Sequence, residues 1–192
     1  QRARVDADGQ LDWVTGQMGG KLIKAFMEID LDGAGSWGRM SGLYFPDGQQ
    51  LMDLDTQQNH NAPHTTSDLL FKGVLKDQAR SVWQGMIKAL PGAQKTDGFQ
   101  ANRNMILGRQ ARADSIPGLE IQADDVRCTH AAAVGQIEEE LLYYLMSRGI
   151  PRHEAEKLVV DGFFVPVLDL IPFENVRDRM MAYVERKLLV EL

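Results

Sequence analysis

The single cysteine of this chain lies two residues before a histidine, in the segment VRCTHAAAVGQIEEE. On a β-strand, residues two apart point to the same face, so Cys128 and His130 could both contact one ligand or one partner. A thiolate beside an imidazole is how thiol enzymes activate a nucleophile, and both groups also bind metals. A single cysteine is also common in a packed core, where its thiol is usually inert. Spacing alone therefore leaves packing, a metal or cluster role, and thiol catalysis open.

The remaining histidines carry weaker signals. Two of them, His60 and His64, fall in the segment NHNAPH, but no carboxylate or cysteine spacing completes a metal site around them. We interpret this segment as a polar turn fixed by Pro63. His153 falls in the first turn of an acid-rich helical segment, and we expect it to be exposed to solvent.

Two short segments resemble known binding motifs, but the residues around them do not fit those motifs. Residues 33–38 read GAGSWG, but a dinucleotide-binding loop needs a helix directly afterwards, and the following residues contain Gly42 and Pro46. Residues 30–33 read DLDG, like the start of a calcium loop, yet Ala34 and Ser41 stand where later ligands belong. We interpret both stretches as turns.

Composition excludes several classes of protein. The chain has 192 residues, a net charge of −6 and 44% hydrophobic residues, which suffices for a packed core and argues against broad nucleic-acid binding. No apolar run approaches the roughly 20 residues that a membrane-spanning helix needs. A single cysteine suits a reducing compartment. The chain opens on QRARVDADG without an initiator Met, and we expect a fragment truncated on its N-terminal side.

Up to residue 137, the sequence predicts short strands separated by turns. Strand-like runs include QLDWV, GKLIKAFMEID, LLFKGVL, SVWQGMIKAL and LEIQADDVRC, and dipeptides such as Asp8-Gly9, Asp47-Gly48 and Pro117-Gly118 indicate turns between such runs. No segment of helical period interrupts them, so a sandwich, a barrel or a parallel β-solenoid fits. The absence of a strict repeat speaks against the solenoid on pattern alone.

After residue 137, the period becomes helical. The segment EEELLYYLMSRGIP has acids in its first turn and Gly149 as a natural end, and Pro151 can open a second helix that ends at Gly162. An apolar connector, FFVPVLDLIP, then leads to a third helix, FENVRDRMMAYVERKLLVEL. We therefore predict a β domain over residues 1–137 and a small helical domain over residues 138–192.

Long collinear stretches resemble the SUF iron–sulfur cluster assembly scaffold family, on the SufD side of the SufB/SufD pair. They include AQKTDGFQANRNMILG, LEIQADDVRCTHAAAVGQIEEELLYYLMSRGI and AEKLVVDGFF, and the likeness covers residues 56–165. SufB-type chains carry a cysteine ligand where this sequence has Ala113, and a glutamate where it has Ala131. Both departures favour the SufD type.

The resemblance implies a right-handed parallel β-helix followed by a C-terminal helical domain. It implies a non-enzymatic scaffold in the cytoplasm or plastid stroma that pairs with a SufB-like subunit and docks a SufC-like ATPase. It makes His130 the candidate iron or cluster ligand shared with that partner, and Cys128 a weaker one. The nascent iron–sulfur cluster is expected to be transient at the interface, with none bound tightly to the isolated chain. The alternative is a thiol-dependent enzyme that uses Cys128 and His130.

Two surfaces are expected to bind other chains. The strand edge near residues 125–137 has small side chains that let another backbone approach, so it should form the subunit interface, and without its partner the chain could form a homodimer there. The helical domain should dock the ATPase, because its connector is more apolar than a free-standing end needs. The residues expected at that docking site are Leu168, Leu170, Ile171, Pro172 and Phe173.

Overall fold

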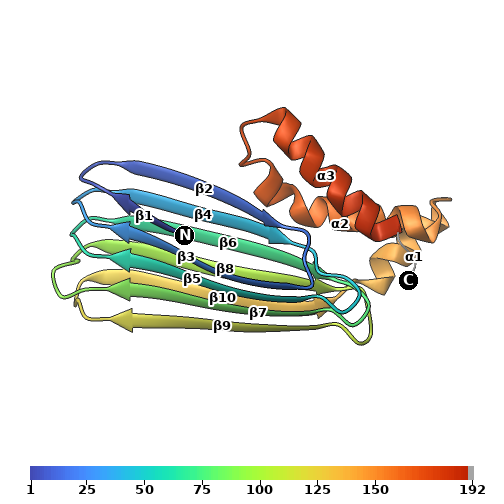
Figure 1. The fold of residues 1–192 in the computed structure, drawn as a ribbon, viewed down its shortest axis with the longest axis horizontal. Helices are drawn as coiled ribbons and strands as arrows, with labels where there is room; N and C mark the ends of the chain where they lie inside the picture. The colour runs from blue at the N-terminus through green and yellow to red at the C-terminus, as the bar shows by residue number, and fades with distance from the viewer. Residues whose placement is uncertain (190–192) are drawn as a thin grey trace.

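The computed structural model describes residues 1–189, which form ten strands followed by three helices (Figure 1). The strands are β1 (Arg2–Val5), β2 (Gln10–Gln17), β3 (Leu22–Leu31), β4 (Trp37–Tyr44), β5 (Leu51–His60), β6 (Thr66–Leu75), β7 (Arg80–Ala89), β8 (Thr96–Ile106), β9 (Arg112–Ile121) and β10 (Val126–Gln136). The helices are α1 (Glu139–Ser147), α2 (Arg152–Leu168) and α3 (Glu174–Leu189).

The strands of residues 1–189 build two parallel sheets that the chain visits alternately. One sheet has the order β1-β3-β5-β7-β9 and the other β10-β8-β6-β4-β2. Because each strand pairs with the strand two further along the chain, the chain winds as a solenoid of about five turns. The predicted parallel β-solenoid with C-terminal helices is confirmed, and neither an antiparallel sandwich nor a closed barrel is formed.

Unequal turn lengths explain why the sequence has no strict repeat. Stacked residues are separated by 27 positions for Gln10 and Trp37, by 29 for Leu22 and Leu51, and by 32 for Arg80 and Arg112. The strands stay in register because the connecting turns absorb these differences. A solenoid can therefore be regular in space while its sequence has no fixed period.

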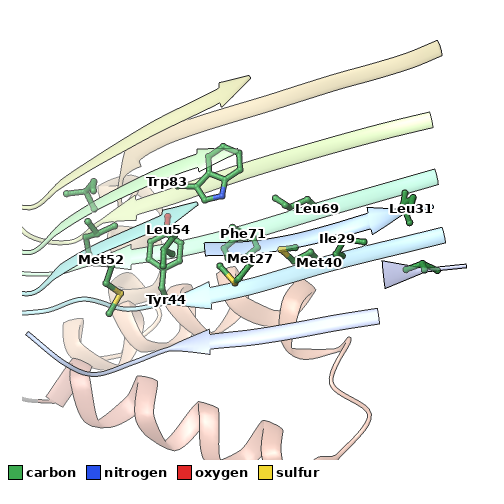
Figure 2. Packing of buried hydrophobic residues seen from close by; sticks show 13 residues of the cluster. Met27, Ile29, Leu31, Met40, Tyr44, Met52, Leu54, Leu69, Phe71 and Trp83 are labelled. Atoms are coloured by element: carbon green, nitrogen blue, oxygen red, sulfur yellow. The ribbon is translucent and has the colours of Figure 1, made fainter. Parts of the chain in front are cut away.

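Alternation along each strand sends every second side chain into the space between the sheets. In β5, Met52, Leu54, Thr56, Gln58 and His60 are buried, while the residues between them are mostly only partly covered. The apolar members of such sets form the main core (Figure 2). The largest side chains of this core include Met27, Ile29, Met40, Tyr44, Leu69, Phe71 and Trp83.

Strand β8 contributes a polar layer to this interior. Its inward side chains Gln100, Asn102 and Asn104 are buried, and Asn104 accepts a 2.5 Å hydrogen bond from the Tyr44 hydroxyl. The two residues meet across Gly73, which lies between them in the register, and a Cβ atom at Gly73 would clash with both. Burial raises the pKa of Tyr44 to about 12, so the hydroxyl keeps its proton.

The three helices follow the predicted order, with one correction. Helix α1 ends before Gly149, whose φ is +88°, as expected of a helix stop. The second helix does not end at Gly162 but continues to Leu168 through Pro166. The segment predicted as an apolar connector is therefore mostly helical, and only its last residues form a loop.

Tertiary packing outweighs the local cost of Gly162 and Pro166. Phe164, Val167 and Leu168 are buried against the outer face of the β2–β10 sheet, with Leu43, Phe45 and Val74 in the same cluster. A proline inside a helix costs about 3 kcal/mol, while burying each large apolar side chain contributes about 1.5–3 kcal/mol. The Lys72 ammonium also donates a 2.7 Å hydrogen bond to the Phe163 carbonyl, one residue from the carbonyl that Pro166 leaves without its helical donor.

Helix α3 is fastened to the solenoid at its C-terminal end. The Lys187 ammonium donates hydrogen bonds of 2.6 Å to Asp47 Oδ1 and 3.0 Å to Gln50 Oε1. Val184 is buried in the cluster shared with α2 and the sheet. The helices thus lie over one face of the solenoid and leave the outer face of the other sheet without a helix (Figure 1).

One predicted strand and one predicted turn are wrong. The run LEIQADDVRC contains the end of β9 and the start of β10, and residues 122–125 turn between them. Pro117 and Gly118 lie inside β9 instead of in a turn. Proline is tolerated there because β9 is the last strand of its sheet. Among the described residues, no helix has the length and apolar character to span a membrane.

Candidate functional site

The candidate site is the open end of the solenoid formed by β9 and β10. In the described chain, β9 pairs only with β7 and β10 only with β8, so each has one edge without a strand. Inward side chains on these strands have no next turn above them. Leu119 is therefore 38% exposed and Val134 48% exposed, although both point toward the interior face. An apolar end with open strand edges is a typical protein interface.

Cys128 lies on the inward face of β10 and is half-buried. It is in register with Gly98, and a Cβ atom at Gly98 would lie 3.4 Å from Cys128 Sγ and 3.3 Å from His60 Nε2. The sulfur therefore points down into the solenoid. Burial raises the pKa of the Cys128 thiol, and a hydrogen bond from the Gly98 backbone offsets this only in part. The thiol form is thus favoured at neutral pH.

His130 lies on the same inward face and is exposed. It is in register with Gln100, so its side chain stacks above the polar layer of β8. Gln100 is fully buried, and its amide donates a 2.9 Å hydrogen bond to the Gly118 carbonyl of β9. The imidazole of His130 thus lies above a buried, hydrogen-bonded Gln100 side chain at the open end of the solenoid, where another chain could reach it.

The structure brings the two predicted ligand residues, His130 and Cys128, to one face of β10. Their Cα atoms are two strand residues apart, about 6.6 Å. Within residues 1–189, no group of three or more His, Cys, Asp or Glu side chains is arranged to hold a metal ion. Iron–sulfur clusters usually take four protein ligands. This end alone therefore supplies at most part of a ligand set.

The structure separates the two histidines of NHNAPH. His60 ends β5 and is fully buried, with Nδ1 2.7 Å from Thr65 Oγ1 and Nε2 2.8 Å from Ser67 Oγ. His64 lies in the following turn with a φ of +58°. The interpretation as a polar turn holds for His64 but is wrong for His60, which is a core residue. His153 is exposed at the start of α2, as expected.

Neither rejected motif forms a site. Residues 32–35 form a turn that leads into β4, and no helix follows. Asp30 belongs to β3, where it accepts hydrogen bonds from Arg2 (2.6 Å) and from Asn59 (2.7 Å). Its carboxylate therefore holds strands together.

The residues expected to dock an ATPase fall into two groups. Leu168 and Ile171 are buried in the cluster that the helices form with the sheet, so their side chains offer little surface to a partner. Leu170 is partly covered, Pro172 is exposed, and Phe173 is 65% exposed. The sequence pattern could not separate these groups, because the face of α2 that meets the sheet depends on the helix continuing past Gly162.

Sequence comparisons place these features in a family. The SufBD core domain of the SUF system for FeS cluster assembly matches residues 1–163. The iron–sulfur cluster assembly protein SufD of Bacillus subtilis is 37% identical over 180 residues, which is 94% of this chain and 41% of the relative. SufD of Escherichia coli is 33% identical over 171 residues, 89% of this chain and 40% of the relative.

A third relative gives the same picture. An iron–sulfur cluster assembly SufBD family protein of Mycobacterium tuberculosis is 38% identical over 194 residues, 97% of this chain and 49% of the relative. The chain spans about half the length of such curated relatives, or less. The chain belongs to the SufBD core family of the SUF iron–sulfur cluster assembly system, as its resemblance predicts.

Proposed function

We propose that this chain is part of a SufD-type scaffold subunit that has no catalytic turnover of its own. It pairs with a SufB-like subunit through the open end of the solenoid, and a nascent iron–sulfur cluster forms there before transfer to an acceptor protein. The compartment is the cytoplasm or a plastid stroma. The observation that carries this proposal is the exposed His130 on the unpaired edge strand β10, within an apolar rim.

His130 is the ligand that this chain contributes. A neutral imidazole can replace a cysteine as an iron ligand, as it does in some iron–sulfur centres. At the rim, the imidazole can face thiolates of the partner, and the apolar surroundings exclude water once the two subunits meet. Cys128 is the weaker candidate, because its sulfur points into the solenoid toward Gly98 and its pKa is raised.

The test is anaerobic reconstitution of the complete complex with His130→Ala, followed by iron and sulfide analysis. We expect the complex to assemble with an unchanged melting temperature and to lose cluster formation. Cys128→Ser is the matched control, since it changes the adjacent inward residue, and it should retain most of the cluster. Cluster formation at the wild-type rate in His130→Ala would make His130 a packing residue and remove this function from the open end.

The thiol-enzyme alternative finds no support at this end. A catalytic cysteine needs a lowered pKa and an imidazole within hydrogen-bond reach. The pKa of Cys128 is shifted in the opposite direction, and its sulfur lies against Gly98. We therefore propose the scaffold role alone.

We propose further that a SufC-like ATPase docks on the exposed apolar residues between α2 and α3. Phe173 is 65% exposed, Pro172 beside it is exposed, and Leu170 is partly covered. Leu170→Asp combined with Phe173→Asp should abolish ATPase binding in a pull-down while circular dichroism stays normal. Leu158→Asp, on an exposed position of α2, serves as the control. Undiminished binding by the folded double variant would exclude this surface.

A further inference from the structure

On the outer face of the sheet that contains β10, a row of side chains stops at Gly135, which has none. Val74, Met105 and Gly135 lie in register on neighbouring strands β6, β8 and β10. Val74 is buried beneath α2, and Met105 is partly buried against the same helices. Gly135 has no side chain to continue this row, and a Cβ atom placed there would meet nothing within 4 Å.

An apolar pocket of about 330 Å³ opens at this gap. Met105, Leu141, Val159 and Phe163 supply its apolar wall, and Glu138 stands at its lining as the charged residue. The Lys72 ammonium, 4.6 Å from the centre of the Phe163 ring, holds one side of the wall in place. The pocket is therefore preformed by α1, α2 and the end of the sheet.

A strand that pairs with the free edge of β10 would bring a side chain to this pocket. Pairing continues the sheet, so one residue of the added strand stands next to Gly135 in the outward-facing row. The side chain of that residue on the added strand would extend the outward-facing row of Val74 and Met105 beneath helices α1 and α2. Glycine at position 135 leaves it unobstructed.

A second copy of this chain is a poor source for that side chain. The outward positions of its β10 are Arg127, Thr129, Ala131, Ala133 and Gly135, none of which is large and apolar. Its β9 offers Ile116, but this residue lies in the middle of β9, whereas Gly135 lies one residue from the end of β10. The composition of these outward positions therefore favours a different chain as the source of the strand that fills the pocket.

We infer that the pocket at Gly135 is the socket for one large aliphatic or aromatic side chain on the edge strand of a non-identical partner subunit. The inference rests on the proposed pairing through β10 and names the contact that makes this pairing selective for a different chain over a second copy. It assigns a role to the small residue at position 135: the glycine admits the partner's side chain between the sheet and helices α1 and α2.

The experiment measures binding of a SufB-type subunit to the chain with Gly135→Val. Valine suits an extended strand and has free space here, so the variant should fold with an unchanged or higher melting temperature. It occupies the mouth of the socket, and excluding one large apolar side chain should raise Kd at least about tenfold. Ala133→Val adds bulk to the same face of β10 outside the pocket, and its Kd should stay within about threefold of wild type.

Five outcomes decide the inference. Tenfold weakening in Gly135→Val alone supports it, whereas wild-type affinity in that variant, or equal weakening in both variants, overturns it. Self-association, measured by sedimentation, should not respond to Gly135→Val; if it weakens as much as partner binding, the socket receives a second copy. A wild-type chain that never binds the SufB-type subunit would refute the pairing itself, and the socket with it.

Discussion

His60 should make the stability of this chain fall in weakly acidic solution. Its imidazole is fully buried, and burial lowers its pKa to about 4 from an ordinary value of 6.5. Thr65 Oγ1 also lies 3.2 Å from the Ala62 carbonyl, to which it donates, so the hydroxyl is left to accept a hydrogen bond from His60 Nδ1–H. Ser67 then donates to Nε2. The neutral ring is thus satisfied on both sides, and protonation would bury a positive charge that the carboxylate of Asp97 offsets only in part.

The size of the stability loss follows from the pKa values of His60 in the folded and unfolded chain. Above pH 6.5, the ring is neutral in both the folded and the unfolded chain, so it adds no pH dependence. Between pH 6.5 and about 4, His60 binds a proton in the unfolded chain but stays neutral in the folded chain. The free energy of unfolding therefore falls as pH falls. At about 1.4 kcal/mol for each pKa unit, the loss is about 3 kcal/mol by pH 4. Below pH 4, this contribution no longer changes.

Urea unfolding at intervals from pH 7 to pH 4 measures this loss. Carboxylates also titrate in that range, so the informative quantity is the difference between wild type and His60→Gln. The glutamine variant should be less stable at pH 7 but should lose about 3 kcal/mol less on acidification. His153→Gln, at an exposed position of α2, should follow the wild-type curve. If His60→Gln has the same pH slope as wild type, the buried imidazole does not control acid stability.

Two further predictions test the interior. Gly73→Ala should lower the free energy of unfolding by about 1–3 kcal/mol in urea titrations, because its Cβ atom would separate Tyr44 from Asn104; an unchanged midpoint would mean that the two residues do not meet across the glycine. Cys128 should react with iodoacetamide more slowly than a free cysteine at pH 7.5, since burial raises the pKa of its thiol; faster labelling would restore the thiol-enzyme hypothesis.

The strands and helices were predictable where one local signal decides the structure. Alternating apolar residues place β3 and β5, and Gly149 ends α1 as its φ of +88° requires. The choice of a solenoid over a sandwich was not decided by pattern, because turns of different length hide the repeat. The family resemblance supplied that choice. The predicted end of α2 at Gly162 was wrong. The free-energy cost of Gly162 and Pro166 inside a helix is smaller than the free energy gained when the continued helix buries its apolar side chains.

The candidate site was predictable only in part. Strand alternation correctly puts Cys128 and His130 on one face, which the register on β8 also gives. Their different exposure depends on the ring of residues beneath them: Gly98 leaves room for the sulfur, while the buried Gln100 lies beneath the imidazole. These neighbours are about 30 residues away in sequence, as Gly98 is from Cys128, so no local pattern could reveal them.

The position of His130 at the last turn of the solenoid is consistent with the ligand role that we propose for it. Inside the solenoid, every polar side chain must find a partner within the chain, as His60 does with Thr65 and Ser67. At the open end, no further turn within residues 1–189 covers the inward-facing imidazole of His130, so the imidazole is accessible to another chain. In the proposed function, the strand edge that pairs with another chain is thus the edge that carries His130, the ligand to be shared. Under that proposal, a cluster bound at His130 depends on subunit pairing, and we expect separation of the subunits to release it.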